Sequence, residues 1–230
     1  MKAIEFRRPD SIVSKGFILD SEENIPGIVL LQEWWGVNDQ IKKVAKNLRN
    51  LGWQVLIPDL YKGKVALEAN EAKHLMNGLN FVDAASQDIC GAVKYLKNSG
   101  AKKVAVTGFC MGGALACLAA AHVQELDCAV IWYGYPSPDL MQGKKIKIPL
   151  LGHFALHDEA FDIGGVDELE KKLKKEKANF EFFRYDAKHA FANEEVDSKN
   201  LPYLQYNEEA KQLAWTRTVT FFNHYLNKIK

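Results

Sequence analysis

The segment Gly108-Phe109-Cys110-Met111-Gly112-Gly113 combines a nucleophilic residue type with glycines at the spacing of a very tight turn. An apolar, strand-like run precedes it, and a helix-like run of small residues follows at once. This is the nucleophile-elbow pattern, with cysteine in place of serine. Such a turn lifts the sulfur above a sheet and places it at a helix N-terminus, where the helix dipole and free amides favour a thiolate. The pattern predicts covalent catalysis by Cys110.

The glycines have a mechanical purpose in this pattern. Side chains at positions 108, 112 or 113 are expected to collide with the neighbouring strand or helix. The other cysteines, Cys90, Cys117 and Cys128, lie within apolar helix-like or strand-like runs, and we expect them to be buried structural residues.

A cysteine nucleophile needs a base, and the base needs an acid that orients it. With this elbow the chain order is nucleophile, acid, histidine. Asp158 follows a strand-like run at 148–154, and His189 follows another at 180–184, so these two are the candidates. Asp162 and Asp186 lie near the same edge and remain alternatives for the acid. The remaining histidines fall in predicted helices, in a strand or in an earlier loop: His74, His122, His224, His153 and His157.

A third group of candidates follows the apolar run at 27–31. In this loop we expect the amide of Trp34 to join that of Met111 as the two donors that stabilise an oxyanion. Trp35 is expected to line the pocket. Glu33 is costly to bury unpaired, which suggests a functional carboxylate beside the proposed oxyanion site.

The elements that must position these residues alternate between strand and helix. Strands are predicted at 27–31, 53–57, 103–107, 128–132, from 148 onward and at 180–184. Helices are predicted at 38–51, within 68–98 with a break near Gly78, and at 110–121, 163–177 and 207–228. This alternation predicts one α/β domain over residues 1–230, with a mostly parallel sheet covered by helices on both faces. Ligands bind such sheets at the carboxyl ends of the strands, where every candidate residue falls.

Composition excludes several classes of partner. The formal net charge is +1, which argues against nucleic-acid binding, and the run 171–177 is interpreted as a solvated helix face. No stretch approaches the ~20 apolar residues that span a bilayer, and the charged N-terminus lacks the apolar core of a signal peptide. We therefore expect a cytoplasmic monomer with free thiols that acts on a small molecule. Cysteine and histidine spacing predicts no metal site, and the chemistry requires no cofactor.

Taken together, these motifs resemble the dienelactone hydrolase (carboxymethylenebutenolidase) family of the α/β-hydrolase superfamily. The resemblance spans nearly the whole chain and includes 32–38 (QEWWGVN), 58–61 (PDLY), 108–116 (GFCMGGALA), the segment around Asp158 and 187–193 (AKHAFAN). It implies a single-domain α/β-hydrolase fold and a triad of Cys110, His189 and Asp158. It further implies that Glu33 holds the resting thiol and takes its proton when substrate arrives.

The sequence departs from that family where the substrate carboxylate should bind. The bacterial enzymes that it resembles have an arginine four residues after the histidine, where this chain has Asn193. They have another upstream, where residues 62–72 contain none. Lys62, Lys64 and Lys188 are possible substitutes. Trp35, Lys188 and Asn193 are therefore the candidate substrate-binding residues.

The sequence thus predicts a hydrolase that cleaves a lactone or an activated carboxylic ester. A general carboxylesterase or thioesterase with another substrate is the alternative within the hydrolases. Outside them, a redox-active cysteine protein is disfavoured because no resolving cysteine is evident, and a non-catalytic binding module is disfavoured because every triad position holds a competent residue.

Overall fold

The computed structural model describes residues 1–19 and 25–227, and within these residues eight strands form one sheet. The strand order is β1-β2-β4-β3-β5-β6-β7-β8. The parallel strands are β3 (Gly27–Leu31), β4 (Gln54–Pro58), β5 (Val104–Phe109), β6 (Cys128–Trp132), β7 (Leu150–His157) and β8 (Phe180–Lys188). Strands β3 to β6 are buried along their whole length, as continuous apolar runs predict. The predicted α/β fold with a mostly parallel sheet is confirmed.

Two strands at the N-terminus were not predicted. β1 (Lys2–Arg7) and β2 (Val13–Leu19) form an antiparallel hairpin, and β2 pairs antiparallel with β4. Their side chains are mostly exposed or half-buried, so neither strand has the apolar run that identifies the central ones. The hairpin is tied to the helical layer by Arg8, whose guanidinium pairs with Asp83 and Asp88. A long-range ion pair of this kind leaves no local pattern in the sequence.

The helices follow the predicted positions. They are α1 (Asp39–Asn50), α2 (Ala69–Asn77), α3 (Phe81–Asp83), the π-helical η1 (Ala84–Ile89), α4 (Cys90–Asn98), α5 (Met111–His122), α6 (Ile163–Lys175) and α7 (Glu208–Leu226), with short 3₁₀ turns η2 (Pro138–Met141) and η3 (Val196–Lys199). The predicted break near Gly78 separates α2 from α3. The predicted last helix extended to residue 228, which lies outside the described residues.

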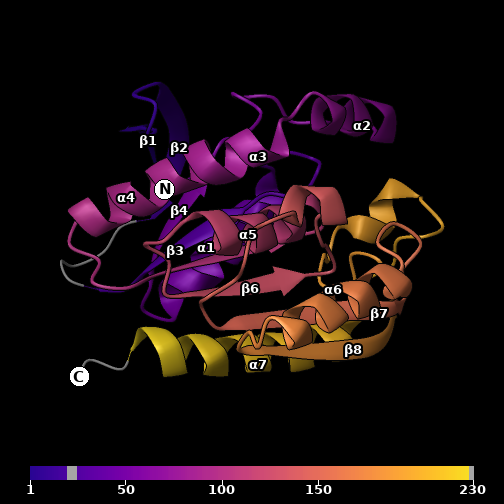
Figure 1. Cartoon of the computed structure of the whole chain (residues 1–230). Coiled ribbons are helices and arrows are strands. Elements are labelled where there is room, and N and C mark those ends of the chain that lie inside the picture. Colours follow the sequence, from indigo (N-terminus) through magenta and orange to yellow (C-terminus); the bar gives the residue numbers. More distant parts are fainter. Residues whose placement is uncertain (20–24, 228–230) are drawn as a thin grey trace.

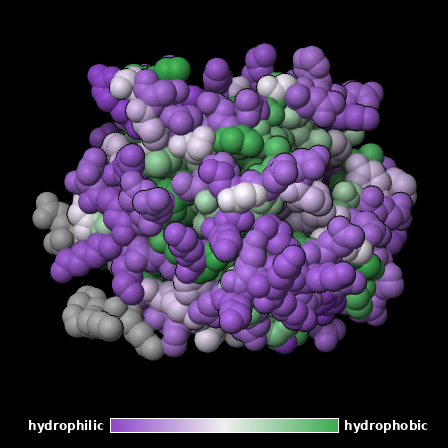
Figure 2. Space-filling view, viewed as in Figure 1, coloured by the Kyte–Doolittle hydropathy of each residue, from purple (hydrophilic) through white to green (hydrophobic). Residues whose placement is uncertain are grey.

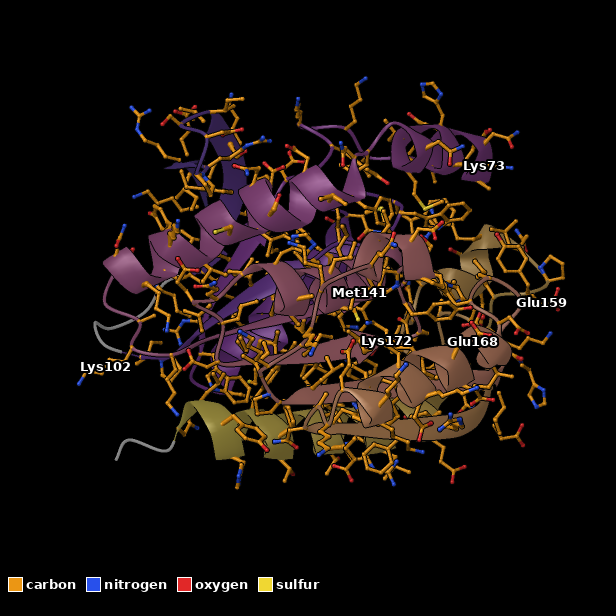
Figure 3. All side chains as sticks on the ribbon, viewed as in Figure 1. Lys73, Lys102, Met141, Glu159, Glu168 and Lys172 are labelled. Atoms are coloured by element: carbon orange, nitrogen blue, oxygen red, sulfur yellow. The ribbon has the colours of Figure 1, made fainter. Side chains whose placement is uncertain are left out.

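The helices cover the sheet on two sides. Figure 1 shows α3, α4 and α5 on one side of the sheet and α7 on the other. Side chains of α1 and α7 line one pocket, so these two helices share a face. The run at 171–177 lies on α6 and just after it, where Lys174 and Lys172 pair with Glu170 and Glu176. Glu168 and Lys172 lie along this helix in Figure 3, and the face drawn in Figure 2 is mainly hydrophilic. This run is the solvated helix face that the sequence predicts.

Of the described helices, none is both long enough and apolar enough to cross a bilayer.

The sharpest feature of the fold is the turn from β5 to α5. Cys110 has φ +55° and ψ −121°, a backbone conformation that non-glycine residues rarely adopt. Its N–H donates to the carbonyl of Trp132 at 3.0 Å, and its carbonyl accepts from the amide of Gly113 at 2.8 Å. A Cβ built on Gly108 would lie 2.2 Å from the carbonyl oxygen of Gly112. Backbone atoms in close contact therefore leave no room for a side chain at this position, as the sequence predicts.

We expect Gly112→Ala to destabilise the protein by about 3 kcal/mol or more. The added Cβ would lie 2.6 Å from the carbonyl oxygen of Gln32 and 2.7 Å from that of Leu31, and both are backbone atoms that cannot rotate away. The measurement is the free energy of unfolding in urea. Gly78→Ala is the matched control, since its Cβ would meet nothing closer than 3.6 Å, and it should be neutral or stabilise by up to ~1 kcal/mol. Equal effects of the two substitutions would contradict a sterically forced turn.

Candidate active site

Cys110 lies at the carboxyl end of β5, at the N-terminus of α5. The residue is buried, with 7% of its surface exposed. The position matches what the tight turn predicts, a side chain raised above the sheet edge where parallel strands leave room for a ligand. Cys90, Cys117 and Cys128 are buried as well, and all four cysteines are free.

His189 and Asp158 form a buried hydrogen-bonded pair. Nδ1 of the imidazole lies 2.7 Å from Oδ2 of the carboxylate, and the two side chains are 3% and 1% exposed. The second oxygen, Oδ1, accepts from the amides of Ala160 and Phe161 at 2.8 and 2.7 Å. The carboxylate is therefore fixed from both sides, and it holds the imidazole with Nε2 directed away from the pair.

The two alternative acids have other partners. Asp162 caps α6, where its side chain accepts from the amide of Gly164 at 2.7 Å. Asp186 pairs with His157 at 2.7 Å, and both are exposed. Of the three candidate acids, Asp158 is the one that contacts His189.

The other buried histidine belongs to the core. Nδ1 and Nε2 of His153 bond to the hydroxyls of Tyr185 and Thr218 at 2.8 and 2.9 Å. Burial lowers the pKa of His153 to about 3, with a contribution from the charge of Arg217. This imidazole is a neutral structural group, as its place within a predicted strand suggested.

The electrostatics around His189 differ from those around His153. Burial by itself opposes a charged ring, but the neighbouring Cys110 sulfur and the hydrogen bond to Asp158 together raise the pKa of His189 to about 10. A hydrogen bond between the Cys110 side chain and the imidazole contributes to this shift. The imidazole therefore lies between the sulfur and the carboxylate, within proton-transfer range of both groups.

Aromatic side chains enclose the imidazole. Phe161 stacks on His189 with ring centroids 5.6 Å apart, and Tyr133 meets it edge-on at 5.2 Å. The hydroxyl of Tyr61 donates to Sδ of Met111 at 3.2 Å. Burial, followed by the charge of Cys110, raises the pKa of Tyr61 and of Tyr203, which indicates that both phenols lie near the sulfur. Aromatic rings therefore surround the imidazole and the sulfur.

Glu33 is buried beside this group, and both of its carboxylate oxygens have partners. Oε1 accepts from the hydroxyl of Tyr133 at 3.2 Å, and Oε2 accepts from the side-chain amide of Asn193 at 2.7 Å. Burial raises the pKa of Glu33, although the charge of His189 and these two hydrogen bonds oppose the shift. The resemblance implied a carboxylate that holds the resting thiol. Here its hydrogen-bonding partners are Tyr133 and Asn193.

Two of the candidate substrate-binding residues have other partners in the structure. Asn193 is buried, and its amide nitrogen donates a hydrogen bond to the carboxylate of Glu33. Nζ of Lys188 donates to the carbonyl oxygen of Pro202 at 3.0 Å. Lys188 ends β8 and Asn193 follows it. Both were predicted to bind substrate because the resembled family uses arginines to bind the substrate carboxylate, one of them at the position of Asn193.

The two tryptophans lie together in the loop after β3. Their rings meet edge-on with centroids 5.0 Å apart; Trp35 is buried and Trp34 half-buried. Nζ of Lys199 lies 4.4 Å from the ring centroid of Trp35. The amide of Met111 is the first of α5, where no intrahelical acceptor exists. The loop and the helix start therefore meet at the same sheet edge, with β3 and β5 paired side by side.

Sequence analysis missed Tyr133, which has a central place in this site. It is fully buried, has φ +37° and contacts both Glu33 and His189. It directly follows β6, so the rule that ligands bind at carboxyl ends of strands could have included it. Phe161 follows the candidate acid by three residues and could have been found in the same way. Tyr203 follows no strand, and no local pattern distinguishes it.

Across the described residues, no group of three or more histidine, cysteine, aspartate or glutamate side chains is arranged to hold a metal ion.

Comparison with known proteins identifies the family. The profile of the dienelactone hydrolase family matches residues 15–226, nearly the whole chain. The chain belongs to the dienelactone hydrolase family. It is accordingly a carboxylic ester hydrolase, the enzyme class that the sequence predicted. "Protein usf" of Aquifex pyrophilus is 30% identical, and the match covers 97% of this chain and 98% of that protein. A protein of Aquifex aeolicus, provisionally named carboxymethylenebutenolidase, is 29% identical over the same shares.

Solved structures support the same fold. A dienelactone hydrolase-like promiscuous phosphotriesterase from metagenomic libraries superposes with a TM-score of 0.82 at 20% identity, covering 97% of this chain and 98% of its own. An esterase of Pyrococcus furiosus gives a TM-score of 0.70 at 18% identity, covering 98% and 92%. At these identities the likeness concerns the fold.

We expect the substitution Glu33→Gln to change how stability depends on pH. The folded-state pKa of Glu33 is raised above its unfolded value of about 4.3, so the folded state holds this proton more tightly. The wild type should therefore lose stability as pH rises from about 4 through the raised pKa, and a glutamine cannot titrate. The measurement is the free energy of unfolding in urea between pH 4.5 and 8. The value for the variant minus that for the wild type should increase as pH rises. A constant offset would reflect only the amide's lost or gained hydrogen bonds, and a trend of opposite sign would refute the raised pKa.

Proposed function

We propose that this protein hydrolyses a small lactone or an activated carboxylic ester by acyl transfer to Cys110. The observation that carries the proposal is the chain of contacts from the Cys110 sulfur through the imidazole of His189 to the doubly anchored carboxylate of Asp158. A nucleophile, a base and an orienting acid in this order are the minimum that acyl transfer requires. Family membership supports the same reaction class.

In the first step the thiolate sulfur attacks the carbonyl carbon of the substrate. A new C–S bond forms, and the carbonyl oxygen takes the electron pair as an oxyanion, which the amides of Met111 and Trp34 stabilise. The tetrahedral intermediate then collapses, the C–O bond breaks, and His189 gives its proton to the leaving oxygen. Because the pKa of His189 is raised to about 10, the ring holds that proton at neutral pH until it is needed. In a lactone the released hydroxyl stays attached to the acyl group.

In the second step His189 takes a proton from water, and the resulting hydroxide attacks the thioester carbon. The C–S bond breaks, the sulfur leaves as the thiolate, and the carboxylic acid product gives up its proton to solvent. Asp158 stabilises the imidazolium in both steps and does not itself change protonation. Tyr133 and Asn193 hold Glu33 beside this group, so it acts on the proton balance of His189 through its charge.

We propose further that the preferred substrate carries no carboxylate of its own. Asn193 supplies a neutral amide to Glu33 at the position where the bacterial enzymes have an arginine. Arg8, Arg184 and Arg217 are engaged by Asp10, Glu170 and Tyr185, respectively. These features favour neutral lactones and esters, as for a general carboxylesterase, over a charged dienelactone.

Replacement of the nucleophile tests the proposed mechanism. We expect Cys110→Ala to reduce kcat for p-nitrophenyl acetate by at least ~10³-fold, because the triad acts as a unit, while the melting temperature stays close to that of the wild type. Cys110→Ser is the matched control, since it keeps a nucleophile of the same shape and should keep more activity than alanine. Mass spectrometry of the wild type mixed rapidly with substrate should find the acyl group on residue 110. Unimpaired hydrolysis by the alanine variant would rule out this mechanism.

The charge preference has its own test. The wild type should cleave p-nitrophenyl acetate with a kcat/KM at least equal to that for the p-nitrophenyl half-ester of succinic acid. Lys188→Ala should leave the ratio of the two kcat/KM values unchanged within about twofold, since its ammonium is bound to the carbonyl of Pro202. A strong preference for the half-ester that the substitution abolishes would show instead that Lys188 binds a substrate carboxylate.

A further inference from the structure

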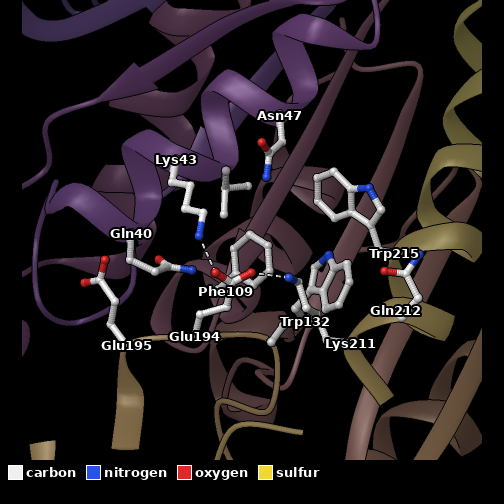
Figure 4. Close-up of a pocket in the computed structure, with 12 residues that line it drawn as sticks. Gln40, Lys43, Asn47, Phe109, Trp132, Glu194, Glu195, Lys211, Gln212 and Trp215 are labelled. Carbon is white, nitrogen blue, oxygen red and sulfur yellow. Dashed lines mark hydrogen bonds and ion pairs between the residues drawn. The ribbon is translucent and has the colours of Figure 1, made fainter. Parts of the chain in front are cut away.

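A second cavity lies on the face of the sheet that α1 and α7 cover. Its volume is about 270 Å³. Phe109 from β5 and Trp132 from β6 form its floor, and Trp215 from α7 forms a wall (Figure 4). Phe109 and Trp132 are register partners, so their side chains share one face of the sheet. Their ring centroids are 5.0 Å apart, and that of Trp215 lies 6.4 Å from Trp132. The cavity therefore has an aromatic surface of a size to match a flat ring.

The cavity also contains a buried polar atom that lacks a partner. Gln40 on α1 lines the cavity, and it is 4% exposed. Its Oε1 makes no hydrogen bond with any of the described residues. In Figure 4 the amide nitrogen of this side chain faces Glu194. A buried carbonyl oxygen without a donor costs free energy, which a ligand with an N–H or O–H group would recover.

The charged residues at the mouth of the cavity balance one another. Lys43 on α1 and Lys211 on α7 both pair with the carboxylate of Glu194, which the dashed lines in Figure 4 mark. Glu195 lines the same mouth. Two positive and two negative groups leave no net charge, so nothing at the mouth selects an ion. The remaining polar groups, Asn47 and Gln212, are exposed amides.

We propose that this cavity is a second binding site. Its ligand would be a neutral aromatic molecule with one ring or two fused rings and a single hydrogen-bond donor. The rings would stack on Phe109, Trp132 and Trp215, and the donor would meet Oε1 of Gln40. The size agrees, because an apolar cavity of about 150 Å³ already holds benzene. The lining residues do not include Cys110, His189 or Glu33, so the site is separate from the proposed catalytic one. Ala192 and Glu194 in its wall nevertheless belong to the segment that begins at His189.

Indole and benzofuran test the proposal, since the two bicyclic molecules differ in one ring atom, an N–H donor against an oxygen. Binding is measured by calorimetry on the full-length Cys110→Ala protein, which removes any reaction with the nucleophile. We expect one equivalent of indole to bind about five- to tenfold more tightly than benzofuran, the usual worth of one hydrogen bond. Gln40→Met keeps the side-chain length without the acceptor, and it should abolish the preference for indole.

Two further variants keep the test decisive. Gln54→Met removes another buried glutamine, on β4, and should leave the preference intact. Val44→Phe fills the cavity from α1 and should abolish binding of both probes, even if Gln40→Met fails to fold. The proposal is overturned if neither probe binds at millimolar concentration, if Gln40→Met keeps the preference, or if Val44→Phe binds as well as its parent. It is also overturned if alkylation of Cys110 in the wild type blocks indole, because the probe would then occupy the catalytic cleft.

Discussion

The backbone conformation of Cys110 is the constraint on which the rest of the site depends. A residue with φ +55° is held in place only if its surroundings leave it no alternative. Here the surroundings are backbone atoms at very short range. A Cβ on Gly134 would lie 2.0 Å from the carbonyl oxygen of Cys110, and one on Gly113 would lie 2.6 Å from the carbonyl oxygen of Trp132. At these two glycines the segment after β6 and the start of α5 are thus in backbone contact with the turn, with no room for a side chain between them.

Two carboxyl groups lie buried around that turn, although burial disfavours their charged forms, and each has hydrogen-bonding partners. Asp158 has two amides and an imidazole, and Glu33 has a phenol and an amide. These partners carry no formal positive charge when His189 is neutral. The Cys110 sulfur and the carboxylate of Asp158 favour a protonated His189, which explains why its pKa moves in the opposite direction from that of His153. Two buried imidazoles in one fold differ because one has acidic neighbours and the other has hydroxyls.

Much of this architecture could be predicted from the sequence because its signals are local. The buried strands are continuous apolar runs, Gly78 interrupts a helical pattern, and the turn at Cys110 needs glycines at fixed offsets. What the sequence could not indicate depends on contacts between distant residues. The hairpin of β1 and β2 is held through Arg8 by residues about eighty positions away, and Asn193 reaches Glu33 across 160 positions. The sequence predicts Asn193 to bind substrate because the resembled family has an arginine there, whereas its contact with Glu33 leaves no local pattern.

The order of these elements along the chain has a consequence for biosynthesis. The proposed nucleophile is residue 110, so it is synthesised well before His189. The backbone of His189 is fixed by a β-bridge to Leu204 and by the amide of Gln205, which donates to its carbonyl at 3.1 Å. Phe191 is fixed in the same way by the amide of Asn207, the residue that caps α7. A polypeptide still emerging from the ribosome therefore carries its thiol long before the imidazole that would activate it is locked in place. The backbone contacts that fix His189 and Phe191 can therefore form only after residues 204–207 have been added, almost a hundred positions beyond the thiol.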